Sequence, residues 1–230
     1  MNSLPDAYIP KVYGRSKGHP LRAAHQQLMT CFLPRVAMPD PAAGPVDLAA
    51  LFPGAEDFEL EVGFGGGEHL AFQAAQKPNV GFIGAEPFVN GVAKLLAHIE
   101  SDNLKNVRVH HGDARPMIEQ LPGGRFSRIF VLHPDPWPKK RHYKRRMISP
   151  WFLEEAARLL KPDGVLRVAS DIPDYVRWTL MHARNAPQFE WTAERAGDWR
   201  IRPDDWPQTR YEAKAVRESR TPAYLQFRRI

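Results

Sequence analysis

Apolar and polar positions alternate along the chain with two different periods from residue 58 onward. Short continuous apolar runs predict buried strands at 58–62, 80–85, 107–109, 128–132 and 165–169, and weaker runs predict late strands at 189–192 and 223–228. Apolar residues three or four positions apart predict helices at 68–76, 89–99, 114–121, 151–160 and 174–186. This alternation predicts an α/β fold, a Rossmann-like, mostly parallel, doubly wound sheet of about seven strands with helices on both faces.

The first 53 residues lack this alternation. Residues 1–20 are polar, contain several prolines and glycines, and carry Lys11, Arg15 and Lys17, so they predict a flexible basic arm. A short helix is expected at 21–33, followed by a proline-rich connector that reaches Pro53. We therefore expect an N-terminal region, 1–53, and a single domain, 54–230, with packed secondary structure beginning only after the connector.

Composition narrows the class of protein. The 230 residues carry a formal charge of +6 and a pI near 9.5, which favours an anionic partner only mildly. A single cysteine, Cys31, excludes an internal disulfide framework and fits a reducing compartment. No apolar run has membrane-spanning length and no secretion signal is evident, so we expect a cytoplasmic protein without membrane contact. A monomer and a homodimer are equally compatible with the sequence.

Residues 131–146 combine a stiff loop with a dense group of cations. Pro134, Pro136 and Pro138 cannot lie in a central strand, and they bias Asp135 and Trp137 toward extended backbone. Six of the eight residues in 139–146 are Lys or Arg. A solvated basic loop would explain this pattern, and so would an active-site loop joined to a phosphate-binding segment.

Glycines follow the first predicted strand at Gly63, Gly65 and Gly67. A dinucleotide fingerprint requires Gly-x-Gly-x-x-Gly, but counted from Gly63 its last position falls on Glu68. Acidic residues at Glu61 and Glu68 suit a cofactor that has a cationic end and no phosphate, such as S-adenosylmethionine, better than a pyrophosphate. A glycine-rich turn alone is weak evidence for a cofactor site, because many such turns are only turns.

Acidic residues also follow the later strands. Glu86, Asp113, Asp135 and Asp171 come at or just after the ends of four successive strands, where ligands bind in parallel sheets. Each has a plain structural explanation: Glu86 could cap a helix at the surface, and Asp113 fits an N-cap as well as an adenine contact. The placement of all four acidic residues at one edge of the predicted sheet favours a binding site there. His110 and His111 lack partners at metal-ligand spacing, so no metal site is expected.

Several motifs together resemble the bacterial tRNA (guanine-N7)-methyltransferases. They are Glu61–Gly67, Gly84–Glu86, Gly112–Ala114, the Pro-Asp-Pro-Trp loop 134–137 with Lys139, the basic segment 141–146, Ser170-Asp171 and Thr209–Glu212. The resemblance extends from about Tyr13 to Arg228 and is carried most specifically by the Pro-Asp-Pro-Trp loop. His133 and Tyr211 depart from it, because Phe is common at both positions.

The resemblance implies a class I methyltransferase domain at 54–230 that uses S-adenosylmethionine and acts on tRNA at a variable-loop guanine. The implied cofactor contacts are Glu61, Gly63, Gly65, Gly67, Glu86, Asp113 and Asp135. The implied substrate contacts are Lys139, Asp171, Thr209, Arg210, Tyr211 and Glu212. The implied RNA-binding residues are Arg141, His142, Tyr143, Lys144, Arg145 and Arg146.

Asp135 is the candidate catalytic residue, because a fixed carboxylate can stabilise the positive charge that develops on a base methylated at N7. Trp137 is expected either to stack on that base or to pack under the loop. Three other functions remain open from the sequence: a nicotinamide oxidoreductase, a non-catalytic RNA-binding module, and a methyltransferase acting on protein or a small metabolite.

Overall fold

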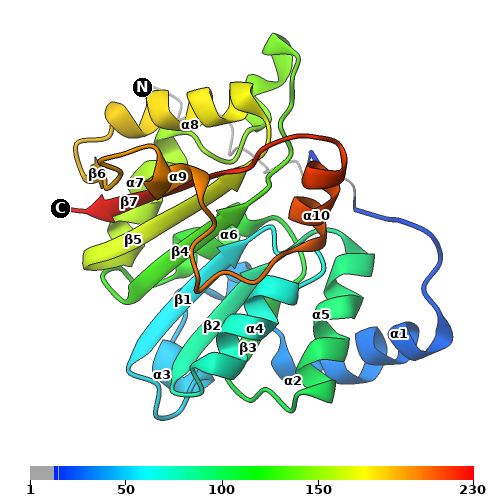
Figure 1. Ribbon diagram of the computed structural model, residues 1–230. Coiled ribbons are helices and arrows are strands. Elements are labelled where there is room, and N and C mark those ends of the chain that lie inside the picture. Colours follow the sequence, from blue (N-terminus) through cyan, green and yellow to red (C-terminus); the bar gives the residue numbers. More distant parts are fainter. Residues whose placement is uncertain (1–12, 15) are drawn as a thin grey trace, which may run out of the picture.

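A seven-stranded sheet forms the centre of the molecule (Figure 1). The structure is a computed structural model that describes residues 13–14 and 16–230. The strand order is β3-β2-β1-β4-β5-β7-β6, and β7 runs antiparallel to both of its neighbours while the other pairs are parallel. The strands are β1 Asp57–Val62, β2 Val80–Ala85, β3 Val107–His110, β4 Phe126–Leu132, β5 Leu160–Ser170, β6 Phe189–Trp191 and β7 Ala223–Arg229. The expected mostly parallel α/β sheet is therefore confirmed.

Helices connect the strands and extend beyond them at both ends of the chain. The N-terminal ones are α1 Ala23–Gln27, the π-helical turn η1 Leu28–Phe32, α2 Leu33–Val36, the 3-10 turn η2 Pro41–Ala43 and α3 Leu48–Leu51. Those of the doubly wound part are α4 Glu68–Gln76, α5 Val89–Ser101, α6 Ala114–Gln120, the 3-10 segment η3 Lys140–Arg145, α7 Pro150–Leu159 and α8 Pro173–Arg184. The last two are α9 Gly197–Arg200 and α10 Arg210–Arg217. The sequence pattern did not predict η3, α9 or α10.

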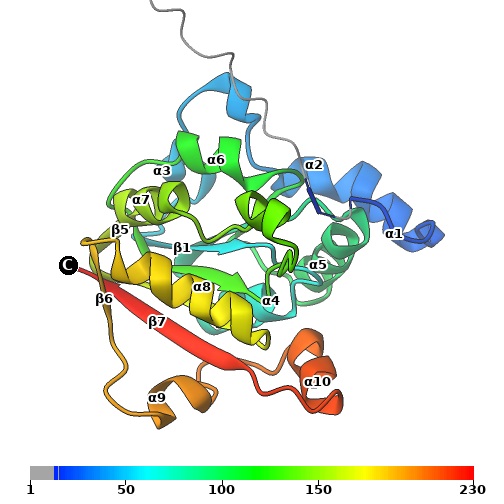
Figure 2. The ribbon, with the colours of Figure 1, turned by 90° about the horizontal axis from the view of Figure 1, so that it is seen from above.

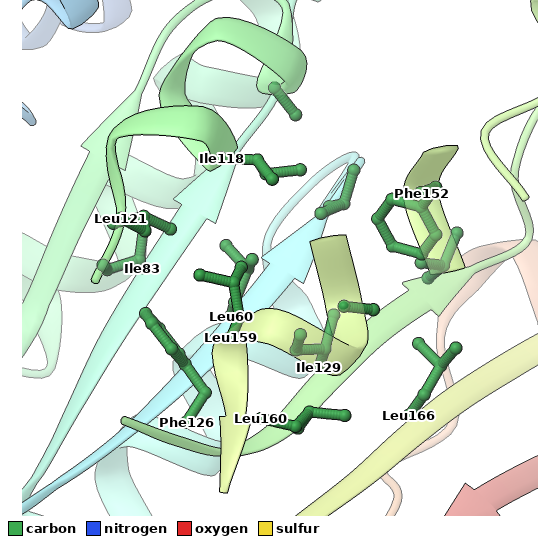
Figure 3. Packing of buried hydrophobic residues seen from close by; sticks show 14 of the residues in the cluster. Leu60, Ile83, Ile118, Leu121, Phe126, Ile129, Phe152, Leu159, Leu160 and Leu166 are labelled. Carbon is green, nitrogen blue, oxygen red and sulfur yellow. The ribbon is translucent and has the colours of Figure 1, made fainter. Parts of the chain in front are cut away.

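Two hydrophobic clusters cover the two faces of the sheet. One joins the sheet to α6, α7 and α8, and the other joins β2 and β3 to α4, α5 and η1. Figure 2 shows α6 and α7 on one side of β1 and α4 and α5 on the other. Figure 3 shows the first cluster from close by, where Leu60 and Ile129 from adjacent central strands lie among side chains of α6 and α7. The helices thus hold the strand ends at fixed positions.

The proline-rich connector does not behave as the sequence suggested. Met38, Val46, Leu48 and Phe52 are buried in the first cluster, so packed structure begins before residue 53. Ala37 forms a parallel bridge with Val109 and thereby extends the sheet beyond β3. The apolar residues between the prolines are irregularly spaced and match neither a strand nor a helix pattern, so the sequence did not indicate this burial. The expected basic residues Lys11 and Arg15 lie outside the described residues.

One turn also differs from expectation. The sequence 161–164 was expected to separate helix from strand, but β5 begins at Leu160 and includes it. Leu160 pairs with Phe126 and Val165 with Arg128, so the intervening residues form a bulge against β4. Asp163, with φ of 61°, provides the reversal that the bulge needs. No helix within the described residues has both the length and the apolar character needed to cross a membrane.

Candidate active site

A cleft of about 380 Å³ lies at the carboxyl ends of the central strands. It is formed where β1 and β4 are neighbours and the chain winds away in opposite directions, which is the usual ligand position in such sheets. The lining residues that belong to the predicted site are Gly63, Gly65, Glu86, Asp113, Asp135 and Arg145. The structure therefore brings together residues from four strand ends, as the rim of acids predicted.

Glu86 fixes the glycine-rich turn. Its carboxylate accepts hydrogen bonds from the backbone N–H of Gly65 at 2.7 Å and of Phe88 at 2.9 Å. Only 8% of the residue is exposed, and burial raises the pKa of its carboxyl despite these two bonds. Glu86 is therefore no surface cap; it connects the end of β2 to the turn after β1.

Glycine is required by close approach in this turn. A Cβ at Gly67, which has φ of 78°, would lie 2.7 Å from Leu95 of α5. A Cβ at Gly91 would lie 2.0 Å from the carbonyl oxygen of Gly65, so α5 is packed directly against the turn. Gly63 and Gly65 line the cleft, whereas Gly67 serves the packing of α4 on α5.

Glu61 and Asp113 show that a predicted contact residue can have a structural partner. Glu61 is buried and its Oε2 lies 2.7 Å from Nδ1 of His69, and it does not line the cleft. Asp113 does line the cleft, but it is also the N-cap of α6, accepting from the N–H of Arg115 and pairing with its guanidinium at 2.9 Å. Their assignment to the cofactor stays a prediction.

The Pro-Asp-Pro-Trp loop places Asp135 at the mouth of the cleft. Solvent reaches its side chain, but the surrounding atoms desolvate the carboxylate enough to raise its pKa. Trp137 and His133 have positive φ values of 42° and 50°. The prediction of extended backbone at Trp137 is therefore wrong. Such conformations are unfavourable for residues other than glycine and are retained mainly at functional sites.

The basic segment divides into exposed and buried cations. Lys139, Lys140, Arg141 and Lys144 are exposed on or next to η3, whereas Arg146 is only 2% exposed. The burial of Arg146 corrects its expected place among the RNA-contacting residues.

Arg146 anchors the loop instead. Its Nε donates to the carbonyl of Pro136 at 2.9 Å, and its guanidinium pairs with Asp174 at the start of α8. The same guanidinium lies 3.9 Å from the centre of the Tyr143 ring. Tyr143 is thereby held against the protein as well.

Arg145 faces the cleft between two aromatic rings. Its guanidinium carbon lies 4.8 Å from the centre of the Tyr13 ring and 4.9 Å from that of Trp137. His142 packs against Trp137 with ring centres 5.8 Å apart, and desolvation together with the neighbouring cations lowers the pKa of His142. No sequence signal pointed to Tyr13, because its partners lie far along the chain.

Two of the predicted substrate residues, Thr209 and Glu212, line a second, smaller cavity of about 10 Å³. Thr209 caps α10 by accepting from the N–H of Glu212, and the buried Glu212 accepts from the hydroxyl of Tyr224 at 2.7 Å. Arg210 lies 3.5 Å from Glu68. The backbone of Tyr211 belongs to α10, but its side chain is outside the described part.

Asp171 contacts both a cation and a histidine. Its carboxylate accepts from Nε of Arg220 at 2.5 Å and lies 3.3 Å from Nδ1 of His133. Burial alone would raise the pKa of Asp171, but these hydrogen bonds outweigh it and hold the pKa below its usual value. His133 also lines both cavities, which the sequence gave no reason to expect.

Comparisons with known proteins identify the family. Residues 56–224 match the family model described as a putative methyltransferase. The tRNA (guanine-N(7)-)-methyltransferase of Rhodospirillum rubrum is 52% identical over 223 residues, covering 95% of this chain and 88% of that protein. The corresponding protein of Ruegeria pomeroyi is 51% identical over 234 residues, covering 99% of this chain and 98% of that protein. The chain belongs to the tRNA (guanine-N7)-methyltransferase family.

Solved structures agree on the fold of this family member. The 16S rRNA methyltransferase KamB superimposes with a TM-score of 0.57 at 17% identity, covering 78% of this chain and 91% of KamB. TrmN from Thermus thermophilus superimposes with a TM-score of 0.52 at 17% identity, covering 80% of this chain and 47% of TrmN. The methyltransferase therefore has the class I fold that its motifs implied.

The cleft of the methyltransferase fits S-adenosylmethionine, the methyl donor of this class. Each oxygen of Glu86 uses one lone pair for a backbone N–H, so a second lone pair on each remains for the ribose hydroxyls. Gly63 and Gly65 present bare backbone to the ligand. Glu86, Asp113 and Asp135 all line the cleft, and their carboxylates favour a ligand with a cationic end.

Proposed function

We propose that the protein transfers the methyl group of S-adenosylmethionine to N7 of a guanine in tRNA, and that Asp135 acts at the reacting base. The observation that carries this assignment is the position of Asp135, which lines the cofactor-sized cleft and belongs to the same loop as the exposed basic segment. Membership of the family supplies the reaction. The variable-loop position of the guanine is proposed from the resemblance alone.

The chemistry requires alignment more than proton transfer. S-Adenosylmethionine, when bound, supplies an electrophilic methyl group on a sulfonium. Guanine N7 has a lone pair and no proton, so no general base is needed at the nucleophile. The protein contributes a fixed geometry and a carboxylate, Asp135, that stabilises the cation formed on the base.

Four residues are assigned to the cofactor from the geometry of the cleft. Glu86 binds the ribose of S-adenosylmethionine and Asp113 binds near its adenine. The backbone of the glycine turn at Gly63 and Gly65 contacts the cofactor where it lies against the turn. Glu61 acts behind the turn through His69, whose ring it holds at 2.7 Å.

RNA is held by the exposed cations of the basic segment. Lys139, Arg141 and Lys144 are free to reach phosphates, because each is exposed. Phosphate contacts release counterions and give binding that weakens with salt. Extracting the target base from RNA structure costs a few kcal/mol, which these contacts offset.

The test combines product analysis with one substitution. Purified protein is incubated with tRNA and methyl-labelled S-adenosylmethionine, and the labelled nucleoside is identified and mapped. We expect 7-methylguanosine, sensitive to ribonuclease treatment of the substrate, and we expect Asp135→Ala to lose methylation while tRNA affinity largely survives. A labelled protein, a labelled small molecule, or equal loss of tRNA affinity in Asp135→Ala and Arg141→Ala would contradict the proposal.

A further inference from the structure

His133 has an unusual position that the assigned functions do not use. It follows β4 directly, and its N–H donates to the carbonyl of Ala169 on β5 at 2.8 Å. Its φ of 50° is unfavourable for a residue with a side chain, so the surrounding structure must enforce it. Among the described residues, only Leu132 and His133 line both the cofactor-sized cleft and the smaller cavity at Thr209 and Glu212.

The imidazole is oriented by a charged neighbour. Asp171 lies 3.3 Å from Nδ1 of His133, and Arg220 holds the other oxygen of Asp171 at 2.5 Å. The lowered pKa of Asp171 means that its carboxylate is ionised at neutral pH and can only accept hydrogen bonds. The proton of a neutral His133 therefore lies on Nδ1.

That tautomer leaves an acceptor on the other ring nitrogen. Nε2 carries a lone pair, and within the described part of the chain it has no hydrogen-bond partner. Only 7% of the side chain is exposed, so the surroundings that Nε2 can reach are chiefly those of the two cavities. Nε2 is therefore an available acceptor beside the two cavities, and a ligand that donates to it gains a hydrogen bond in partly desolvated surroundings.

We infer that His133 is a substrate-contacting residue whose Nε2 accepts a hydrogen bond from the Watson–Crick edge of the target guanine. When N7 faces the methyl donor, the opposite edge of the base carries the N1–H and the exocyclic amino group, and both are donors. Asp135 takes one of these donors and His133 the other. Adenine has no N1–H and no amino group at C2, so the same contact discriminates against adenine. This inference rests on the proposed function.

The choice of residue at this position then has a consequence for specificity. Phenylalanine has no acceptor and can only pack against a base, whereas histidine with Asp171 behind it can read a donor. Glutamine places an amide oxygen near the position of Nε2 and keeps an acceptor. These two substitutions therefore separate the hydrogen bond from the volume of the ring.

The test is a double-mutant cycle between enzyme and base. The value of kcat/KM is measured for the wild type, His133→Phe and His133→Gln on tRNA that carries guanosine, inosine or 1-methylguanosine at the target position. Inosine lacks the amino group and 1-methylguanosine lacks the N1–H. Loss of one neutral hydrogen bond corresponds to roughly a fivefold to tenfold decrease in kcat/KM.

Because Asp135 and His133 each take one donor, we expect the wild type and His133→Gln to lose rate on both analogues, and by about that factor on the analogue that lacks the donor of His133. We expect His133→Phe to be slower than the wild type on guanosine but to show little further loss on that analogue. Affinity for S-adenosylmethionine should be equal in all three proteins, which separates contact with the base from a general disturbance of the cleft.

Equal losses for the wild type and His133→Phe on both analogues would overturn the inference. Thermal unfolding of each variant checks folding, and His133→Gln preserves the test if His133→Phe does not fold. Failure of the wild type to methylate tRNA that carries guanosine would instead refute the proposed function.

Discussion

Replacement of Arg146 by methionine tests whether this cation supports the catalytic loop or contacts RNA. The change removes the hydrogen bond to the carbonyl of Pro136, which leaves that acceptor without its charged donor. A hydrogen bond from a charged group contributes about 1.5–3 kcal/mol. The pair with the half-exposed Asp174 adds at most about 1 kcal/mol, because solvent screens it. Methionine fills most of the volume, so the cavity term is small.

We therefore expect Arg146→Met to lower the free energy of unfolding by about 3 kcal/mol, which for a chain of this length lowers Tm by roughly 6–12 °C. Urea unfolding and calorimetry measure these quantities. Methylation should fall as well, since the loop that carries Asp135 loses its anchor. The salt dependence of tRNA binding should be unchanged, because a buried guanidinium releases no counterion.

The matched control is Arg141→Met, which removes an exposed cation from the same segment. Its stability should be within about 0.5 kcal/mol of the wild type. The slope of log affinity against log salt should decrease in magnitude by about 0.7–0.9, the effect of one phosphate contact. If Arg146→Met were as stable as the wild type and showed the reduced slope, Arg146 would be an RNA contact and our reading of its burial would be wrong.

Three further substitutions test the cleft and the core. Burial raises the pKa of Asp135. A carboxyl whose pKa is raised in the folded state contributes stability below its ordinary pKa and loses that contribution as the pH rises through the folded pKa. Asp135→Asn should therefore raise the Tm of the unliganded protein at neutral pH but not in strong acid, while methylation is lost. Methylation needs the ionised carboxylate, so wild-type activity falls as the pH is lowered through the pKa of Asp135. The raised pKa places this fall at a higher pH than for an ordinary aspartate, and a pH profile of kcat/KM measures it. Gly91→Ala should weaken S-adenosylmethionine binding by roughly tenfold or more, because its Cβ would displace the carbonyl of Gly65, whereas Gly197→Ala, whose Cβ meets only Ile201 at 3.6 Å, should bind normally. Phe52→Ala should cost about 3–5 kcal/mol in chemical unfolding if the connector belongs to the core, and a loss below about 1 kcal/mol would contradict this.

Much of the fold followed from periodicity because the central strands and their helices bury complete faces. The bounds expected for 68–76 and 80–85 coincide with α4 and β2. The connector was misjudged because its buried residues, such as Met38 and Phe52, contact the core singly between prolines and therefore leave no periodic signal. Helix α10 was missed because it is strongly polar and has few buried apolar positions.

The candidate site was predictable to the extent that strand ends meet at one edge. Glu86, Asp113 and Asp135 could be placed together from topology alone, since parallel strands bring their carboxyl ends to the same rim. The division between Arg145 in the cleft and Arg146 in the interior could not, because adjacent residues of one basic segment look equivalent until packing is known. The partners of Glu61 and His133 likewise depend on tertiary contacts.

The bridge between Ala37 and Val109 protects one border of the sheet. Strand β3 is the outermost full strand on that side, and an open strand edge is a template on which another chain can pair and aggregate. Residues 36–38 occupy part of this edge, with the N–H of Met38 donating to the carbonyl of Val109 at 2.9 Å. The opposite border ends in β6, which has only three residues. A protein shortened to residues 54–230 would uncover the β3 border, so its solubility would fall even if the methyl-transfer cleft remained intact.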